Sequence, residues 1–287
     1  QVGIGLSPLR VWNRLEPFDE RPPPAPPGNA PVTPQESQQR LQDILGPEAQ
    51  SRDAQKDYAG LLTHAFRAKM APEEPNIVLA EAGTGVGKTR GYLAPTSLWA
   101  ERNGSPVWIS TFTRNLQRQL EQELDYVFSD ESEKNDHIVV RKGRENYLCL
   151  LNFEEAINRS GTDPLARIPL SLIARWISHT HSGDMVGGDF PAWLADLFGT
   201  GRVLSLTDRR GECVFSACPH YHTCFIEKTI RKARTSDIVI ANHALVMVQA
   251  AMGGLDDGTL PTRYVFDEGH QVFGAADGAF SAQLSTI

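Results

Sequence analysis

The sequence predicts an α/β fold in which a central parallel sheet is interrupted by a mostly helical insertion and preceded by a disordered, proline-rich leader. Short apolar runs bounded by turn residues alternate with segments of helical periodicity, which is typical of parallel strands joined by helices. Between Tyr147 and Phe225 this alternation stops, and all four cysteines of the chain lie there. The runs expected to form strands are Ile77–Ala80, Val107–Ser110, Ile138–Val140, Ile238–Ala241 and Tyr264–Phe266.

The order of these patterns divides the chain into four segments. Prolines crowd the stretch between Arg21 and Pro34, so the leader, residues 1–50, should be extended, with one short amphipathic helix from Pro34 to Leu45. The first part of the sheet domain, the insertion and the second part of the sheet domain are expected at residues 51–145, 146–225 and 226–287.

Composition and charge restrict the class of protein. The 287 residues are 40% apolar and 22% charged, as in ordinary globular proteins, and no apolar run reaches the length of a membrane span. The N-terminus lacks a secretory signal, so we expect a cytoplasmic protein that does not act on membranes. The net charge of −7 argues against a general nucleic-acid binder. Two basic clusters, Arg141–Arg144 and Lys228–Arg234, could still hold phosphates; the alternative is a solvated surface.

A glycine-rich loop directly follows the first expected strand. Glu81 to Thr89 reads EAGTGVGKT, which matches the phosphate-binding loop with Ala82 where the strict pattern has glycine. Successive backbone N–H groups can surround a phosphate, Lys88 can reach the β- and γ-phosphates of ATP, and the Thr89 hydroxyl can bind Mg²⁺. An accidental surface turn is the alternative. The expected nucleotide-binding residues are Gly83, Thr84, Gly85, Val86, Gly87, Lys88 and Thr89.

The last expected strand ends in two acids, Asp267 and Glu268. Asp267 is suited to hold Mg²⁺, and Glu268 to position and activate the water that attacks the γ-phosphate. Such a pair could also be a capped turn. Together with the glycine-rich loop, however, it completes the set of groups that hydrolysis of Mg–ATP requires.

The four cysteines suggest a metal centre. Cys213, Cys218 and Cys224 follow the spacing C-x4-C-x5-C, and Cys149 stands well upstream. Without a secretory signal, metal binding or redox chemistry is favoured over structural disulfides. Four thiolates can hold a [4Fe–4S] cluster or a structural Zn²⁺. His220 and His222 are available to complete a zinc site, and unpaired buried cysteines are the remaining alternative.

These motifs, in this order, resemble the DinG and XPD family of iron–sulfur DNA helicases in superfamily 2, and in particular its bacterial DinG branch. Asp267–His270 is similar to the DEAH box, with Gly269 replacing alanine. The resemblance covers about residues 50–280. It also rests on the segments Lys142–Cys149, Arg210–Cys213, Cys218–Pro219, Cys224–Phe225 and Asp237–Leu245.

The resemblance implies a RecA-like motor domain that binds ATP and Mg²⁺. In it, Gln55, with Arg52, corresponds to the glutamine motif that reads adenine, and His270 couples the nucleotide state to a neighbouring domain. Segment Ser110–Thr113 corresponds to a motif whose hydroxyls touch DNA phosphates. The [4Fe–4S] ligands would be Cys149, Cys213, Cys218 and Cys224, with Zn²⁺ as the alternative.

The resemblance also implies ATP-driven 5′→3′ movement along single-stranded or forked DNA by a monomer, with R-loops as a further candidate substrate. The chain begins at Gln1 without methionine, and Ile287 follows Asp267 by only 20 residues. We therefore expect an incomplete motor that binds nucleotide weakly and does not unwind DNA. The rival interpretations are a zinc-bearing P-loop ATPase that acts as a switch or remodeller, and a non-catalytic nucleic-acid-binding module.

Overall fold

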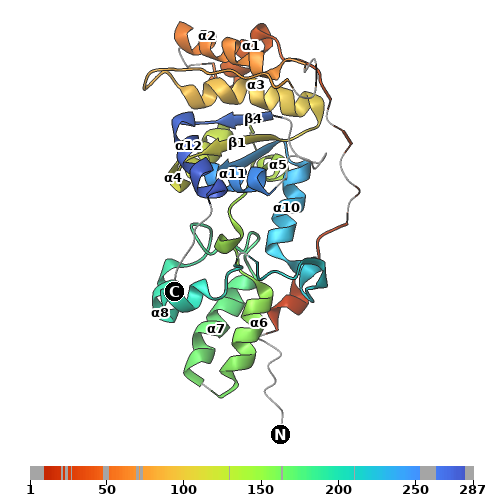
Figure 1. Ribbon diagram of the computed structural model, residues 1–287, viewed down its shortest axis with the longest axis vertical. Coiled ribbons are helices and arrows are strands. Elements are labelled where there is room, and N and C mark those ends of the chain that lie inside the picture. Colours follow the sequence, from red (N-terminus) through yellow and green to blue (C-terminus); the bar gives the residue numbers. More distant parts are fainter. Residues whose placement is uncertain are drawn as a thin grey trace. The chain divides into compact units, whose positions relative to one another are not determined.

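The computed structural model shows two compact units (Figure 1). Gln1–Pro22 and Lys142–Arg231 form the first, here called the cysteine unit; Pro23–Arg141 and Lys232–Ile287 form the second, the sheet unit. No helix within the described ranges is long and apolar enough to cross a membrane. The structure describes residues 10–20, 22, 25–26, 28–47, 52–68, 71, 74–128, 130–162, 164–209, 211–252 and 263–281.

The sheet unit is built on four parallel strands in the order β2-β3-β1-β4. This confirms the predicted α/β class with a parallel sheet, and four of the five predicted strands form. Their bounds are β1 Val107–Thr111, β2 Ile138–Val140, β3 Ile238–Asn242 and β4 Arg263–Phe266. The chain between β2 and β3 belongs to the cysteine unit, so strands distant in sequence become neighbours.

Both faces of the sheet are buried, which explains the continuous apolar runs in the sequence. Ile109 of β1 and Ile238 and Ile240 of β3 pack on one face, against α3 and α4. Trp108 and Val239 point to the opposite face, where they pack with Val246 of α11. These helices span Lys88–Asn103 (α3), Arg114–Glu123 (α4) and His243–Ala251 (α11).

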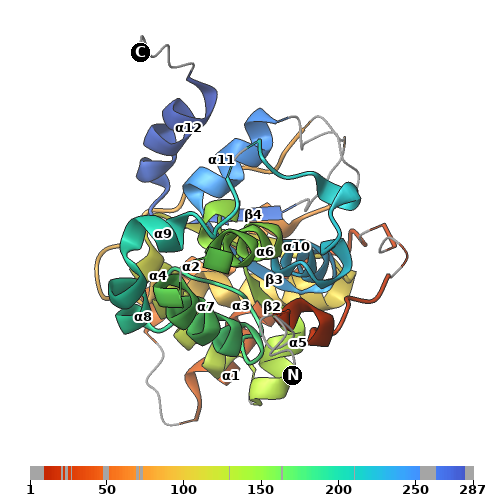
Figure 2. The same cartoon turned by 90° about the horizontal axis from the view of Figure 1, so that it is seen from below.

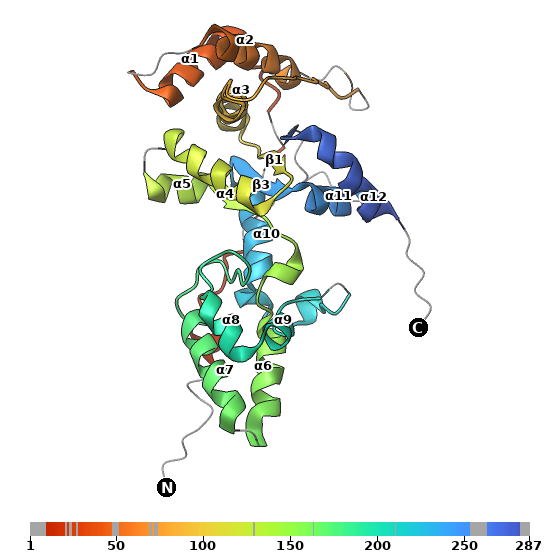
Figure 3. The same cartoon turned by 90° about the vertical axis from the view of Figure 1, so that its left-hand side faces the viewer.

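The remaining helices of the sheet unit cover this core. Helices α1 and α2 pack on each other and on α3, whereas α11 and α12 lie side by side (Figures 2 and 3). Small side chains, Ala59 of α2 and Ala94 of α3, allow the first three helices to approach closely around Leu41. The bounds are α1 Pro34–Leu45, α2 Asp53–Leu62, α5 Glu131–His137 and α12 Val272–Phe280.

The predicted strand Ile77–Ala80 does not form. These residues have no regular secondary structure, and the side chains of Ile77 and Leu79 are 75% and 93% exposed. A strand needs a neighbour to satisfy its backbone hydrogen bonds and to cover its side chains. Among the residues described, β4 is an edge strand and no strand pairs with residues 77–80.

The cysteine unit is mostly helical and has a core of its own. Helices α6 and α7 lie side by side (Figures 1 and 3) and bury Phe153, Ile157 and Ile173 between them and the rest of the unit. Helix α10 begins in this unit and continues into the sheet unit, directly before β3. The bounds are α6 Leu150–Arg159, α7 Pro164–Ile177, α8 Ala192–Phe198, α9 Thr200–Leu204 and α10 Phe225–Thr235.

The expectation of a disordered leader is wrong for the parts of residues 1–50 that the structure describes. Val11, in a short 3-10 helix at Val11–Arg14, is only 2% exposed and belongs to the core of the cysteine unit. The Phe18 N–H donates to the His222 carbonyl at 2.8 Å, and its ring packs on Tyr221. Apolar side chains at Val11, Trp12 and Phe18 thus anchor a segment in which proline content alone predicted disorder.

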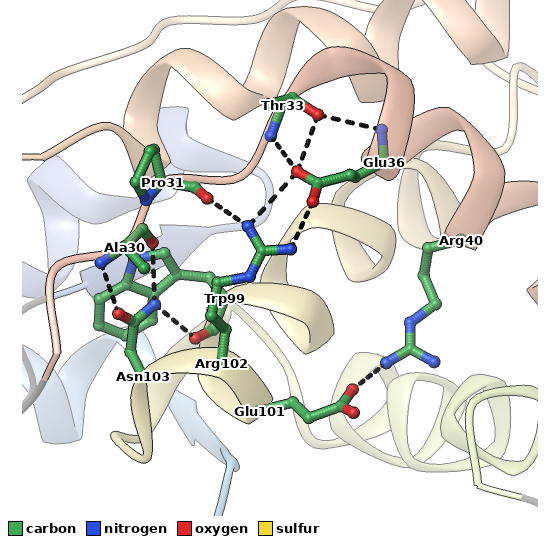
Figure 4. A network of polar contacts seen from close by, with 9 residues as sticks. All are labelled: Ala30, Pro31, Thr33, Glu36, Arg40, Trp99, Glu101, Arg102 and Asn103. Atoms are coloured by element: carbon green, nitrogen blue, oxygen red, sulfur yellow. Dashed lines mark hydrogen bonds and ion pairs between the residues drawn. The ribbon is translucent and has the colours of Figure 1, made fainter.

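The second half of the leader is anchored to the sheet unit, at the C-terminal end of α3 (Figure 4). The buried side chain of Asn103 accepts from the Ala30 N–H at 2.7 Å and donates to the Ala30 carbonyl at 3.0 Å. Arg102 donates to the Pro31 carbonyl and to Glu36. The predicted helix Pro34–Leu45 is confirmed as α1, and Thr33 and Glu36 form a capping box at its start.

The Glu36 carboxylate should make this anchor sensitive to acid. Its hydrogen bonds to Arg102 and Thr33 lower the pKa of Glu36 from 4.5 to about 2. Because the folded state holds the proton less tightly, the stabilisation is present above pH 4.5 and is lost as pH falls from there towards 2. We expect Glu36→Gln to lower the melting temperature at pH 7, and the difference from wild type to shrink when the melts are repeated below pH 4.5. An unchanged difference would contradict the assignment.

Candidate functional site

The glycine-rich loop is exposed and leads directly into α3, which begins at Lys88. Gly85 and Gly87 have φ of +81° and +86°, in the left-handed region that favours glycine. A Cβ on Gly87 would also lie 2.2 Å from Nε2 of Gln55. The sequence therefore places glycine where the turn requires it, and the loop delivers Lys88 and Thr89 to the positive end of a helix.

Two side chains of the α2 region hold this loop. Gln55 is buried and donates from Nε2 to the Gly87 carbonyl at 3.0 Å, and Arg52 donates to the Gly85 carbonyl at 2.7 Å. The structure thus brings the two residues of the expected glutamine motif to the phosphate loop. Each side chain donates to a loop carbonyl, so the backbone N–H groups of the loop are not needed as donors to these two carbonyls.

An open pocket of about 340 Å³ lies beside the loop, in the range of small-molecule sites. Arg90 forms part of its wall, held by an ion pair with Glu123 at 2.7 Å and stacked on the ring of Tyr126. The pocket is lined by Leu45, Arg52, Gln55, Gly85, Val86, Gly87, Thr89, Arg90 and Glu123.

The acidic turn after β4 faces the loop. Lys88 Nζ lies 3.4 Å from Glu268 Oε1, although 180 residues separate the two in sequence. His270 Nδ1 lies 3.6 Å from the other carboxylate oxygen of Glu268. Glu268 has φ +53°, a left-handed conformation that is costly for a non-glycine residue and is concentrated at functional sites. The N–H of Asp267 donates to the Ser110 carbonyl at 2.8 Å and ties this turn to β1.

Asp267 is in an environment that disfavours its charge. Burial and the neighbouring Glu268 carboxylate raise the pKa of Asp267, and Lys88 opposes the shift. The hydroxyl of Tyr92, on α3, donates to Asp267 Oδ2 at 3.4 Å. A divalent cation would relieve the repulsion between the two carboxylates, so the geometry and charge suit Mg²⁺.

Two buried residues at this site were missed by sequence reasoning. Tyr92 is 4% exposed. His243 is 1% exposed and shares a 2.7 Å hydrogen bond with the Ser110 hydroxyl, below the acidic turn. Tyr92 lies three residues after Thr89 on a helix, and this spacing could have identified it. No local signal distinguished His243 from an ordinary core histidine.

The four cysteines come from two stretches of the cysteine unit, one carrying Cys149 and one carrying Cys213, Cys218 and Cys224. Cys149 precedes α6, Cys224 precedes α10, and Cys213 and Cys218 flank a short 3-10 helix. The backbone N–H of Phe215 donates to the Cys213 sulfur at 3.3 Å.

These thiols are neighbours, but they do not yet form a metal group. Burial raises the pKa of the Cys149 and Cys224 thiols, and the sulfurs of Cys218 and Cys149, respectively, add to the shift. Burial raises the pKa of Cys224 to about 11. Within the described ranges, no three histidine, cysteine, aspartate or glutamate side chains converge as a metal site. The donor chemistry fits a metal or cluster, and binding would have to draw the sulfurs together and displace their protons.

The two histidines considered as zinc ligands have other partners. His220 is 5% exposed, its Nε2 lies 2.7 Å from Glu154 Oε2, and its ring packs against Trp12. The ring of His222 packs on Phe18 and Tyr221. The contact with Glu154 occupies only Nε2 of His220 and leaves Nδ1 as the ring nitrogen available to a metal.

The basic cluster Arg141–Arg144 is engaged within the protein rather than presented to phosphates. Arg141 is 9% exposed and lies over the ring of Trp108. Lys142 pairs with the buried Asp184, and Arg144 pairs with the buried Asp208 at 2.5 Å. In the second cluster, Arg231 lies over the ring of Phe18, whereas Lys228 and Arg234 are exposed.

The segment expected to touch DNA through hydroxyls is also partly buried. Ser110 and Thr111 are both 0% exposed, and the Ser110 hydroxyl is bonded to His243. Their neighbours Phe112 and Thr113 are exposed, and Thr113 caps α4 through the Leu116 N–H. Of the four residues, only the last two remain accessible at the end of β1.

Comparison with known proteins finds no matching family model but several homologues. The chain is 31% identical over 249 residues to the ATP-dependent DNA helicase YoaA of Escherichia coli (strain K12), which covers 84% of this chain and 36% of YoaA. It is 29% identical over 256 residues to the ATP-dependent helicase DinG of Mycobacterium tuberculosis (strain H37Rv), which covers 82% and 36%. The 3′-5′ exonuclease DinG of Bacillus subtilis (strain 168) is 28% identical over 201 residues, covering 69% and 20%. The chain thus spans about a third or less of these relatives.

Proposed function

We propose that this chain, which is homologous to the DinG-type DNA helicases over more than four-fifths of its length, carries the ATP-binding part of an ATP-dependent DNA motor. The observation that carries the proposal is the contact between the phosphate loop and the acidic turn. Lys88 and Glu268 are 180 residues apart in sequence and 3.4 Å apart in space. A phosphate loop opposite two carboxylates at a strand end is the arrangement that Mg–ATP hydrolysis requires.

In this proposal each residue of the site has a defined chemical role. The loop N–H groups and Lys88 hold the phosphates of ATP, while Thr89 and Asp267 hold Mg²⁺. Glu268 accepts a proton from the attacking water, for which its carboxylate must leave Lys88 when the γ-phosphate arrives. Gln55 contacts adenine and holds Gly87, and His270 beside Glu268 reports the state of the site to a neighbouring domain.

The proposed motor domain is RecA-like, formed by residues 51–145 and 226–287, with residues 146–225 as an inserted cluster-binding segment. Coupling hydrolysis to 5′→3′ movement along single-stranded DNA requires a second motor domain that closes on the nucleotide. Residues 1–287 are proposed to supply the nucleotide-binding part of this cycle. Phe112, Thr113 and the exposed basic residues Lys228 and Arg234 are the proposed DNA contacts.

Nucleotide binding by the polypeptide of residues 1–287 tests the proposal directly. Lys88→Ala removes the only positively charged side chain between Glu81 and Thr89. We expect ATP affinity to fall by about tenfold or more. Isothermal titration calorimetry with Mg–ATP gives the affinity of each protein. Lys134→Ala, which removes a lysine paired with Asp125 away from the loop, is the control and should bind as wild type. Equal affinities for wild type and Lys88→Ala would reject the assignment.

We further propose that Cys149, Cys213, Cys218 and Cys224 hold a [4Fe–4S] cluster. Support comes from the four cysteines gathered in one unit and from the Phe215 N–H, which donates to the Cys213 sulfur at 3.3 Å, because backbone hydrogen bonds to sulfur are a common feature of thiolate-ligated clusters. When bound, the cluster would stabilise a compact unit, because its bonds join Cys149 to the distant segment that carries Cys213, Cys218 and Cys224.

Metal analysis decides between the cluster and zinc. We expect anaerobically purified protein to be brown, with broad absorption near ~400 nm and about four irons and four sulfides per chain. Cys218→Ser should lower the iron content, whereas Ser216→Ala, in the same loop, should not. A colourless protein with one zinc would leave the ATPase proposal standing and would overturn the cluster.

A further inference from the structure

We propose that Tyr92 is a positioning residue that sets Asp267, the carboxylate proposed to hold Mg²⁺ in the nucleotide site, through a single buried hydroxyl. The inference rests on the proposed function and deepens it, because it concerns the metal half of the same site. Tyr92 does not touch the phosphates or the metal in this scheme. It acts through Asp267, the proposed metal ligand.

The position of Tyr92 follows from the helix that carries the phosphate loop. Tyr92 lies three residues after Thr89 and four after Lys88 on α3, so all three share one face at the start of the helix. The Tyr92 ring is packed in the core between α3 and the sheet, beside Leu93 and Ile109. Its hydroxyl is therefore held at a fixed height below the loop.

The hydroxyl contacts one of the two proposed Mg²⁺ ligands. The Tyr92 hydroxyl donates to Asp267 Oδ2 at 3.4 Å. A phenol can donate a hydrogen bond to a carboxylate, which no apolar residue at this position could do. Tyr92 and Asp267, 175 residues apart in sequence, are thus direct partners.

This arrangement matches the role of groups that lie just outside a metal. Such groups orient the ligands, and their loss commonly lowers metal affinity by about 10–100-fold. The 3.4 Å bond to Asp267 is long for an O–H donor, as expected of a site that tightens only when its ligand is present. The turn that carries Asp267 is already fixed to β1 by its backbone, so the side chain is the part left for Tyr92 to set.

Tyr92→Phe tests the inference, because it removes the hydroxyl and keeps the ring. ATP affinity is measured by calorimetry in excess Mg²⁺ and again in excess EDTA, and the ratio of the two affinities reports the metal contribution. We expect Tyr92→Phe to reduce this ratio by about tenfold or more while the affinity in EDTA stays at the wild-type value. Tyr264→Phe is the matched control: a half-buried tyrosine of β4 that packs with Trp108 and should leave the ratio unchanged.

A second comparison separates positioning from packing. If Tyr92 acts through Asp267, the double variant Tyr92→Phe/Asp267→Asn should show the same ratio as Asp267→Asn alone. The reason is that Asp267→Asn already removes the carboxylate that Tyr92 positions. If the two single substitutions reduce the ratio independently, so that their effects multiply in the double variant, the inference is overturned. An unchanged ratio in Tyr92→Phe also overturns it. If wild type itself shows no ATP binding in either condition, the proposed function falls and this inference falls with it.

Discussion

Replacing Glu268 by glutamine should abolish ATP hydrolysis by the complete motor while nucleotide binding is kept. Glutamine has the same shape but cannot take a proton from water, and removal of a general base typically lowers the rate by about 10²–10⁴-fold. Glu268 also pairs with Lys88 at 3.4 Å, so its neutralisation frees Lys88 for the phosphates. We therefore expect ATP affinity equal to or greater than that of wild type.

The two halves of this expectation are measured separately. DNA-stimulated phosphate release in the complete motor gives the rate of ATP hydrolysis. Calorimetry on the polypeptide of residues 1–287 gives the affinity for ATP. Stability should change little, since Lys88 and Glu268 are both partly exposed. A Glu268→Gln protein that hydrolyses ATP at the wild-type rate would remove Glu268 from the chemistry and would direct attention to Asp267.

Replacing Gly87 by alanine should disable the phosphate loop. At φ +86° a side chain costs about 1–3 kcal/mol, and the new Cβ would lie 2.2 Å from the buried Gln55 amide that holds the loop. If the loop refolds to escape this strain, ATP affinity should fall by roughly 5–150-fold. Calorimetry with Mg–ATP gives the affinity.

Gly83→Ala provides the matched control, in the same loop. A Cβ on Gly83 would have no atom within 4 Å, and Gly83 is not among the residues with positive φ. We expect Gly83→Ala to bind ATP within about twofold of wild type. If both alanine variants lose binding equally, the loop is generally intolerant and the specific contact between Gly87 and Gln55 is not the cause.

Four of the five strands could be predicted because their signals are local. Ile238–Ala241 and Val107–Ser110 are apolar on both faces, and the structure buries them on both faces. The run Ile77–Ala80 carries the same local signal but fails to form a strand, because a strand depends on a partner that no local pattern specifies. Pattern alone cannot tell whether that partner is present.

The site was predicted less completely than the sheet, for a related reason. Charge clusters such as Arg141–Arg144 look like a phosphate patch in sequence, yet Asp184 and Asp208, about forty to sixty residues away, neutralise Lys142 and Arg144. Tyr92 and His243 have the opposite problem. Each looks like an ordinary core residue until distant Asp267 or Ser110 is placed beside it. Partners distant in sequence decide whether a side chain is exposed, paired or functional.

The burial of Val11 in the cysteine unit has a consequence for how the chain is made. Its nearest core partner in sequence, Leu148, follows 137 residues later, and at ribosomal speeds of about 5–20 residues per second it emerges roughly 7–27 s after Val11. Formation of the sheet requires a similar delay, because Val107 of β1 pairs with Ile238 of β3, 131 residues later in the sequence. Neither unit can complete its core until these distant residues have left the ribosome, and Val11 remains without its core partners until then.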